Sequence, residues 1–417
     1  MLQTASNNNL AINKVELGNE FWQGAEAYNV DVYPDINNSN GLDIVGQEYA
    51  NLLTTQNWVG QIKTTDPGVK VAAVANYVHT PALARSTDWN QAFFSASPLP
   101  PVDAVVLHIY TDTNLAALKI LQPNLNPSVP FGGPSNNNAP NVVATMLAVP
   151  FHTWDDIAAN YLNGTDNSSS NPQGLQKGSF KPYVWLTEYN MRDYGFAAFG
   201  TWAHGLYLAT SSLKLLEQPR ITMAIHHEAL GGPLFADILD TTTGFGSSGT
   251  YVNPPSTASL PTIVDDLSAE GVAQEEINTA ALGQTSAQEL LFSNPVPITD
   301  PTDTTYTYPS LYGWHFSGSG TTPQLIILNL GDTAQTLDVS ALAGNTSTYR
   351  QISGFPGAYV KGGDEGSNGK YVAIYAAYVD LIQQIAHEDN LAVTENTLAK
   401  PSALVVPAYS ITRITVQ

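Results

Sequence analysis

Two short stretches of the chain each carry a glutamate in a position suited to acid–base chemistry. INKVELGNEFW (residues 12–22) places Glu20 after a strand-like run, and KPYVWLTEYN (residues 181–190) places Glu188 in a similar setting. Cleavage of a glycosidic bond needs two carboxyl groups flanking that bond, one protonated and one ionised. In a parallel α/β barrel the reacting groups collect where strands end, so two strand-end glutamates of one sheet would meet this requirement.

The segments around these glutamates alternate between strand and helix patterns. Continuous apolar strands separated by helices imply a parallel sheet covered on both faces. Strands are expected at 12–18, 69–77, 102–110, 182–188 and 220–228. Helices are expected at 44–62, around Trp89 and Phe93, at 141–162 and at 202–216. Glu20 and Glu188 would then lie at the same edge of one sheet.

The character of the sequence changes near residue 231. A stretch rich in Gly, Pro, Ser and Thr leads to a helix expected at 268–291. Short segments of β character follow it, among them LYGWHFS, QLIILNLG, TYRQISG, YVAIYAAYV and SITRITV, separated by turn residues. This pattern is typical of an antiparallel β-sandwich. We therefore expect a barrel-type domain over residues 1–292 and a β-sandwich domain over residues 293–417.

Several further residues are candidates for binding a substrate. His108 and Tyr110 share one face of their strand by i, i+2 spacing. Trp22 could stack on a sugar ring. The substrate-binding candidates are Asn19, Trp22, His108, Tyr110 and His226. Each also has a purely structural explanation, as a turn residue, a rim aromatic or a hydrogen-bonded core side chain.

The neighbours of the two glutamates raise separate questions. Strict alternation puts Glu16 and Glu20 on one face and Asn19 on the other, so a bulge or a strand end must intervene. We expect Glu16 to form an ion pair rather than to act in catalysis. The same alternation places Trp185 in the core on the helix side of the sheet. Consecutive His226, His227 and Glu228 cannot all converge on one ion, so no metal site is predicted there.

The motifs LGNE, LTEYN and HIY resemble those of the clan A glycoside hydrolases, retaining enzymes with glutamates on strands four and seven of a (β/α)8 barrel. The resemblance implies that Asn19 binds the sugar 2-hydroxyl, Glu20 is the general acid/base, Glu188 is the nucleophile, and Tyr110 holds the nucleophile. It implies hydrolysis by double displacement without any metal or organic cofactor. The two carboxyl groups should then lie about 5–5.5 Å apart, against roughly 6.5–9.5 Å for inversion.

The resemblance also leaves part of a barrel unaccounted for. A βα unit takes about 30 residues, and only nineteen residues precede Glu20. We therefore expect a truncated chain that holds barrel units four to eight and lacks strands one to three, which a missing N-terminal fragment would supply. Hydrolysis by this chain alone is an open question at this point. The alternative from a different class is a non-catalytic carbohydrate-binding or structural remnant.

Composition limits the partners. The net charge of −21 argues against nucleic acid and anionic membranes, whereas an oligosaccharide, polysaccharide or glycoside would not be repelled. The absence of cysteine excludes disulfides and thiolate chemistry. No apolar run approaches the roughly 18 residues that span a bilayer. The start of the chain shows no signal peptide, and we expect an extracellular or periplasmic protein whose N-terminal leader is missing.

Overall fold

The structure is a computed structural model that describes most of the chain. The described residues are 11–23, 46–78, 84–121, 139–192, 201–227, 230–231, 238–239, 267–356 and 391–417. The strand expected at 371–379 and Glu228 lie outside them. Two compact units are formed, one by residues 1–110, 154–189 and 218–226 and the other by residues 111–153, 190–217 and 227–417.

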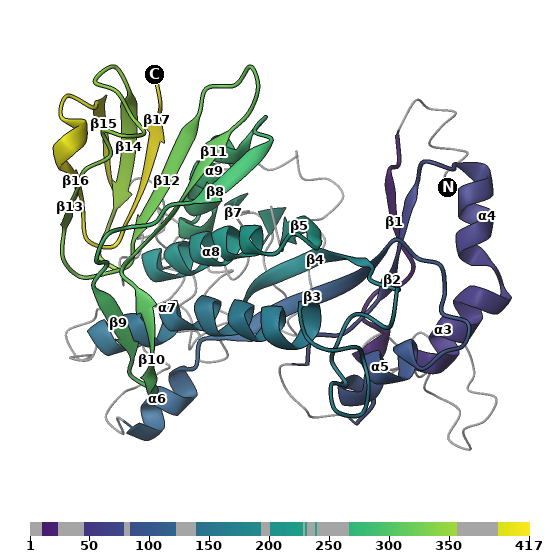
Figure 1. The fold of residues 1–417 in the computed structure, drawn as a ribbon. Coiled ribbons are helices and arrows are strands. Elements are labelled where there is room, and N and C mark those ends of the chain that lie inside the picture. Colours follow the sequence, from purple (N-terminus) through teal and green to yellow (C-terminus); the bar gives the residue numbers. More distant parts are fainter. Residues whose placement is uncertain are drawn as a thin grey trace, which may run out of the picture. The chain divides into compact units, whose positions relative to one another are not determined.

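A five-stranded parallel sheet runs through the first part of the chain (Figure 1). Its strands, in spatial order, are β1 (Lys14–Glu16), β2 (Lys70–Val74), β3 (Ala104–Asp112), β4 (Tyr183–Arg192) and β5 (Ile221–His226). Spatial order equals chain order, and the pairings of β1 with β2, β2 with β3 and β4 with β5 are parallel. The prediction of an α/β fold with a parallel sheet is therefore confirmed.

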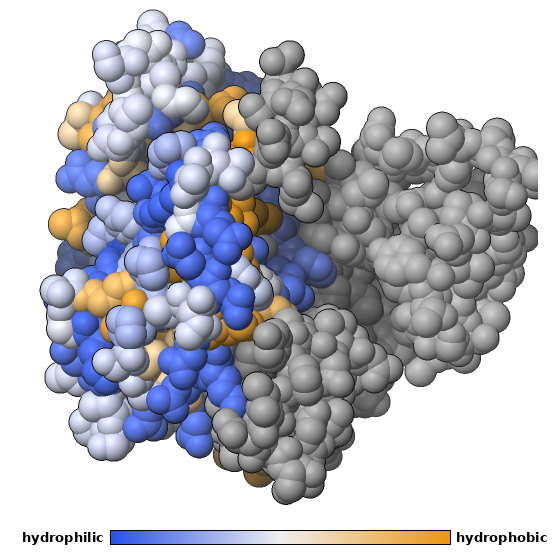
Figure 2. Space-filling model, turned by 90° about the vertical axis from the view of Figure 1, so that its right-hand side faces the viewer, coloured by the Kyte–Doolittle hydropathy of each residue, from blue (hydrophilic) through white to orange (hydrophobic). Residues whose placement is uncertain are grey.

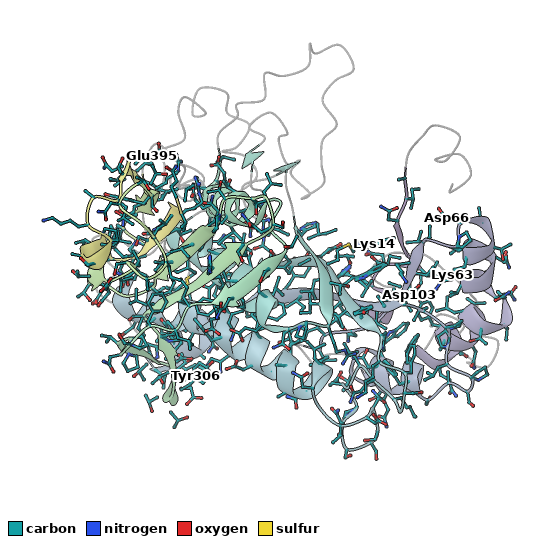
Figure 3. All side chains as sticks on the ribbon, turned by 45° about the horizontal axis from the view of Figure 1, so that its top comes forward. Lys14, Lys63, Asp66, Asp103, Tyr306 and Glu395 are labelled. Carbon is teal, nitrogen blue, oxygen red and sulfur yellow. The ribbon has the colours of Figure 1, made fainter. Side chains whose placement is uncertain are left out.

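Helices connect these strands. They are α3 (Gly46–Thr55), α4 (Trp58–Thr65), α5 (Ala84–Phe94), α6 (Leu115–Leu121), α7 (Ala139–Asp156), which continues as a π-helix at Ile157–Leu162, and α8 (Trp202–Lys214). The single helix expected at 44–62 is wrong, because the chain breaks between α3 and α4 at Asn57, whose φ of 49° no α-helix accommodates. At the N-terminal end of the sheet, Asp103 binds Lys63 of α4 at 2.8 Å and Lys70 of β2 at 3.2 Å (Figure 3).

One face of the parallel sheet carries a small apolar cluster. Trp185 packs there with Ala72, Ala104 and Val106, and Met223 covers its margin. Val106 and His108 are two residues apart in β3 and therefore lie on the same face of the strand. Trp185 is thus in the core, as expected, but on the face of His108 and not on the opposite one. The expectation failed because β4 shifts register on both sides of Trp185 and Leu186, which breaks strict alternation.

The C-terminal part of the chain forms a six-stranded sheet whose pairs are all antiparallel. Its strands, in spatial order, are β15 (Ala392–Thr397), β14 (Thr348–Ser353), β17 (Ser410–Thr415), β12 (Gln324–Asn329), β11 (Leu311–Ser317) and β8 (Ser286–Glu289). A two-stranded sheet of β13 (Gln335–Leu337) and β16 (Leu404–Val406) contributes to the core that includes Leu325, Ile327 and Ile414.

Helix α9 (Ala269–Ala281) contacts β12 and β17 of this sheet and packs against α8. α8, α9 and the six-stranded sheet belong to one compact unit, so that unit includes residues on both sides of residue 292. The helix expected at 268–291 ends ten residues early. Gly283 has a φ of +73°, which ends helical geometry, and Ser286–Glu289 instead pairs with β11 as an edge strand.

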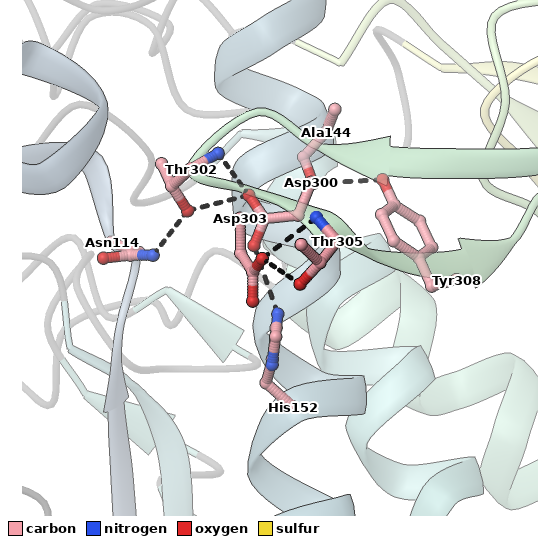
Figure 4. Close-up of polar contacts among 8 residues, drawn as sticks. All are labelled: Asn114, Ala144, His152, Asp300, Thr302, Asp303, Thr305 and Tyr308. Atoms are coloured by element: carbon pink, nitrogen blue, oxygen red, sulfur yellow. Dashed lines mark hydrogen bonds and ion pairs between the residues drawn. The ribbon is translucent and has the colours of Figure 1, made fainter. Parts of the chain in front are cut away.

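A hairpin of β9 (Pro297–Asp300) and β10 (Asp303–Pro309) lies against α7 (Figure 4). Asp300 accepts hydrogen bonds from both the backbone N–H and the hydroxyl of Thr302, which close the turn. Asp300 also lies 3.2 Å from His152 Nε2, and the Tyr308 hydroxyl donates to the carbonyl of Ala144 at 3.1 Å. The hairpin is therefore attached to α7 by polar contacts at both ends.

The surface is mixed in polarity. Figure 2 shows one face on which the coloured residues are mostly hydrophilic or neutral, with hydrophobic residues in small patches. Among the helices that the structure describes, none combines the length and the apolar character needed to cross a membrane.

Two-residue strands β6 (Leu230–Gly231) and β7 (Ile238–Leu239) pair in parallel, outside the larger sheets.

A buried carboxylate joins α9 to the six-stranded sheet. Glu276 is 1% exposed and binds Nε of Arg350 at 2.8 Å and Nε of Arg413 at 2.7 Å. Arg350 also binds Glu395 of β15, whose side chain is 62% exposed, at 2.6 Å. The two glutamates thus share one arginine but differ in burial.

We expect Glu276→Gln to destabilise the chain by about 3–5 kcal/mol, because it removes the buried carboxylate that Arg413 binds and leaves Arg350 only with the exposed Glu395. Glu395→Gln is the matched control and should cost less than about 1 kcal/mol, because that pair is solvated. Urea unfolding of the two variants beside the parent chain measures both values. Equal losses of stability would contradict the assigned role of Glu276.

Candidate active site

The candidate site is built around the imidazole of His108, on β3. Its Nδ1 lies 2.8 Å from Oε1 of Glu20 and 3.5 Å from Oε2 of Glu188, and its Nε2 lies 2.9 Å from the hydroxyl of Thr187. Oxygens of the two glutamates lie within 4.8 Å of each other. The structure thus brings together carboxyl groups that are 168 positions apart in the sequence, within a single compact unit.

Tyr110 lies two residues beyond His108 on the same face of β3. Its hydroxyl donates a hydrogen bond of 2.6 Å to Oε2 of Glu188. A short hydrogen bond to a carboxylate is among the stronger ones in proteins and fixes the orientation of the acceptor. Each glutamate therefore has its own partner, His108 for Glu20 and Tyr110 for Glu188.

The local backbone around Glu20 explains how this side chain turns inward. β1 ends at Glu16, and Gly18 follows with a φ of +128°, a conformation that side-chain-bearing residues rarely adopt. Glu20 itself has a φ of 47°, which is uncommon for a residue other than glycine and is typical of functional sites. The strand end resolves the alternation problem, since Glu20 is buried while Asn19 is exposed.

A tyrosine from α3 fixes the chain just before this turn. The hydroxyl of Tyr49 donates to the carbonyl of Leu17 at 2.6 Å and accepts from the backbone N–H of Val74 at 3.1 Å. Tyr49 is fully buried, and its ring lies edge-on to Phe21, directly after Glu20. Helix packing behind the sheet therefore determines where the Glu20 turn can lie.

Glu188 lies within β4 and not at its end. The strand expected at 182–188 runs on to Arg192, and its register with β5 shifts between Leu186 and Tyr189. Strict alternation would send Thr187 and Glu188 to opposite faces, yet both contact residues on the same face of β3, His108 and Tyr110. The irregularity therefore lets two consecutive side chains enter one site.

Burial and neighbouring groups both shift the pKa values of His108 and Glu16. Burial lowers the pKa of His108, but the hydrogen bond to Glu20 and the charges of Glu188, Glu20 and Glu16 outweigh burial, so the pKa is raised. Burial also raises the pKa of Glu16, which the charge of His108 and a hydrogen bond with the Thr187 side chain only partly offset. Three carboxyl groups thus surround one imidazole.

The remaining predicted residues are placed differently. Trp22 is half-buried in a 3-10 turn (Phe21–Gln23) that directly follows Glu20, and Asn19 is exposed beside it. Contact of either residue with a substrate stays a prediction. Contact of His226 with a substrate also stays a prediction. Its ring packs edge-on against Tyr189 at 5.8 Å, and it lies three residues beyond Met223, which places it on the opposite face of a regular strand.

Two residues of the site were not predicted to belong to it. Thr187 gave no signal of its own, since a threonine in a strand is ordinary. Glu16 was expected to form an ion pair, and its charge does interact with that of His108. Its Oε1 is buried and makes no hydrogen bond. The i, i+4 spacing of Glu16 and Glu20 was the available indication that both face the same region.

We expect Gly18→Ala to destabilise the chain more than Gly178→Ala. Both glycines have positive φ, which costs about 1 kcal/mol for alanine, but a Cβ on Gly18 would lie 2.2 Å from the Phe21 ring, whereas Gly178 faces open space. Thermal unfolding gives the two costs, and NMR signals of the His108 ring should move only in Gly18→Ala. Equal costs with unmoved signals would show that the turn does not position Glu20.

Comparison with known proteins gives a likeness of fold. No family model matches the chain, and no curated protein matches it. A GH51 arabinofuranosidase from Xanthomonas axonopodis pv. citri matches with a TM-score of 0.53 at 11% identity, over 98% of this chain and 67% of that chain. Weaker likenesses include a rhamnosyl-glucuronidase from Fusarium oxysporum 12S (TM-score 0.49, 13% identity, 99% and 72% covered) and a GH30 xylanase C from Talaromyces cellulolyticus (0.44, 12%, 100% and 65%).

At these sequence identities the comparison shows a likeness of fold alone. It rests on the arabinofuranosidase, whose TM-score is above 0.5. The chain spans about two thirds of the length of that arabinofuranosidase. The resemblance to clan A glycoside hydrolases is therefore confirmed at the level of the fold: this chain has the fold of a glycoside hydrolase.

Proposed function

We propose that the chain carries the catalytic site of a retaining glycoside hydrolase. The observation that supports this most directly is the convergence of Glu20 and Glu188, whose nearest donor oxygens lie within 4.8 Å. Retaining enzymes hold their carboxyl groups about 5–5.5 Å apart, whereas inverting enzymes separate them by roughly 6.5–9.5 Å to admit a water. Carboxyl oxygens this close leave little room for a water between the two groups, which favours direct attack by one carboxylate on the anomeric carbon.

The surroundings of the two glutamates suggest their roles. Glu188 has a side chain 27% exposed and keeps the hydrogen bond from Tyr110, which orients an ionised carboxylate for attack. Glu20 has a side chain 9% exposed, and it forms a hydrogen bond with His108. A buried carboxyl group beside an ionised partner holds its proton more readily, as a general acid must.

The reaction then proceeds in two steps. Glu188 attacks the anomeric carbon while Glu20 transfers its proton to the leaving glycosidic oxygen, which gives a glycosyl-enzyme ester and a free alcohol. Glu20, now ionised, removes a proton from water as that water attacks the anomeric carbon. The ester bond breaks, Glu188 is released as a carboxylate, and the configuration of the sugar is retained.

The substrate class follows from charge and from the likeness of fold. A chain of net charge −21 favours a neutral or weakly charged sugar over a polyanion. The structurally similar protein from Xanthomonas axonopodis is an arabinofuranosidase, so an arabinofuranoside heads the substrates to be tested, with glucoside, xyloside and glucuronide beside it. The activity proposed is that of the whole protein to which this site belongs.

We expect Glu188→Ala to abolish hydrolysis of nitrophenyl glycosides, because no group remains to form the covalent intermediate. Added azide should restore turnover, since a small anion fits the space left by the carboxylate and attacks the same carbon. The product should then be a glycosyl azide of inverted configuration, identifiable by proton NMR. Unchanged turnover in Glu188→Ala would refute the proposed nucleophile.

We expect Tyr110→Phe to lower kcat by roughly 10- to 100-fold, as loss of a hydrogen bond to a charged group costs about 1.5–3 kcal/mol. Tyr183→Phe is the matched control, because Tyr183 is 55% exposed on the neighbouring strand. Steady-state kinetics of both variants gives the comparison. Parent-like rates for Tyr110→Phe would show that its contact with Glu188 has no role in turnover.

A further inference from the structure

Three side chains of the site present a compact set of metal-ligand atoms. Nδ1 of His108 and one oxygen each of Glu20 and Glu188 all lie within 4.8 Å of one another. The side chain of His108 is 3% exposed and that of Glu20 is 9% exposed, whereas that of Glu188 is 27% exposed. An ion would therefore approach from the side of Glu188 and reach two buried ligands.

The second nitrogen of His108 is already fixed by hydrogen bonding. Thr187 lies 2.9 Å from Nε2. A hydroxyl can accept a hydrogen bond as well as donate one. When Thr187 accepts from Nε2–H, the lone pair of neutral His108 lies on Nδ1, directed at the two glutamates. Metal-binding histidines are oriented in this way by a partner on their other nitrogen.

Charge and ligand type select the class of ion. Two carboxylates neutralise a divalent cation, and an acidic chain attracts cations. One imidazole with two carboxylates is a mixed N/O set of the kind that zinc accepts, with three protein ligands and an open fourth position. Magnesium and calcium require more oxygen ligands and rarely use imidazole.

The distances are close to those of such a site. Tetrahedral zinc with bonds of about 2.0–2.2 Å holds its ligand atoms roughly 3.4 Å apart. Nδ1 of His108 and Oε2 of Glu188 are 3.5 Å apart, and Nδ1 and Oε1 of Glu20 are 2.8 Å apart. Zinc binding would thus require His108 and Glu20 to separate by about half an ångström, and the two glutamate oxygens, which lie within 4.8 Å of each other, to come to roughly 3.4 Å.

We propose that Zn²⁺ binds to His108, Glu20 and Glu188 and, by occupying both glutamates, competes with the glycoside substrate. Binding of the ion depends only on these three side chains. Inhibition in addition rests on the proposed function, because it requires Glu20 and Glu188 to be the catalytic pair.

The test is calorimetric titration of the full chain with ZnCl₂. We expect His108→Asn to weaken the tightest zinc site by at least about tenfold, since an amide is a poor zinc ligand and even loss of an outer partner costs 10- to 100-fold. His152→Asn is the matched control, because His152 also lies beside a carboxylate, 3.2 Å from Asp300, but outside this cluster. MgCl₂ should give no comparable heat in the parent chain.

Circular dichroism shows whether each variant folds, and Glu188→Gln, at the more exposed ligand, replaces His108→Asn if the latter does not fold. Equal zinc affinity in the parent chain and a folded cluster variant would overturn the inference, as would a loss of affinity in His152→Asn alone. In the parent enzyme, zinc should raise KM and leave kcat unchanged. Zinc binding without any glycosidase activity would refute the proposed function only, and glycosidase activity with no cluster-dependent zinc binding would refute only this inference.

Discussion

The site depends on how one imidazole is held between two carboxylates. Two ionised carboxylates within 4.8 Å would repel each other by at least about 3 kcal/mol at an effective dielectric constant of about 20. His108 places Nδ1 within 3.5 Å of both, and a proton shared there offsets the repulsion. In the proposed mechanism this repulsion would favour one protonated and one ionised carboxyl group.

The elements around the site serve to fix these three side chains. β3 presents His108 and Tyr110 in a regular strand, so the two residues share a face by alternation alone. Glu20 and Glu188 instead reach the site through irregular backbone, a left-handed turn after β1 and a register shift in β4. Regular secondary structure thus holds the partners of the catalytic candidates, and local departures from it deliver the carboxylates.

Buried glutamates are paired differently in the two compact units. Glu276 is enclosed by two arginines and joins a helix to a sheet, whereas Glu16 and Glu20 share a single imidazole and leave one oxygen of Glu16 without a hydrogen bond. A fully paired buried charge gives stability only when its partners are kept. An incompletely paired cluster is typical of sites that transfer protons or bind ligands.

The spacing of apolar residues in the sequence was enough to predict the parallel strands and most of their helices. A strand or helix that buries one or both of its faces repeats its apolar residues at a characteristic interval. These patterns also pointed to Glu20, Glu188, His108 and Tyr110, because the carboxyl-terminal parts of parallel strands lie at one edge of a sheet. Only the tertiary structure decided the entry of Thr187 into the site and the side of the sheet on which Trp185 lies. Both outcomes depend on the register of β4 with its neighbours. Register is fixed by pairing with strands that are distant in the sequence, so the local residue pattern cannot predict it.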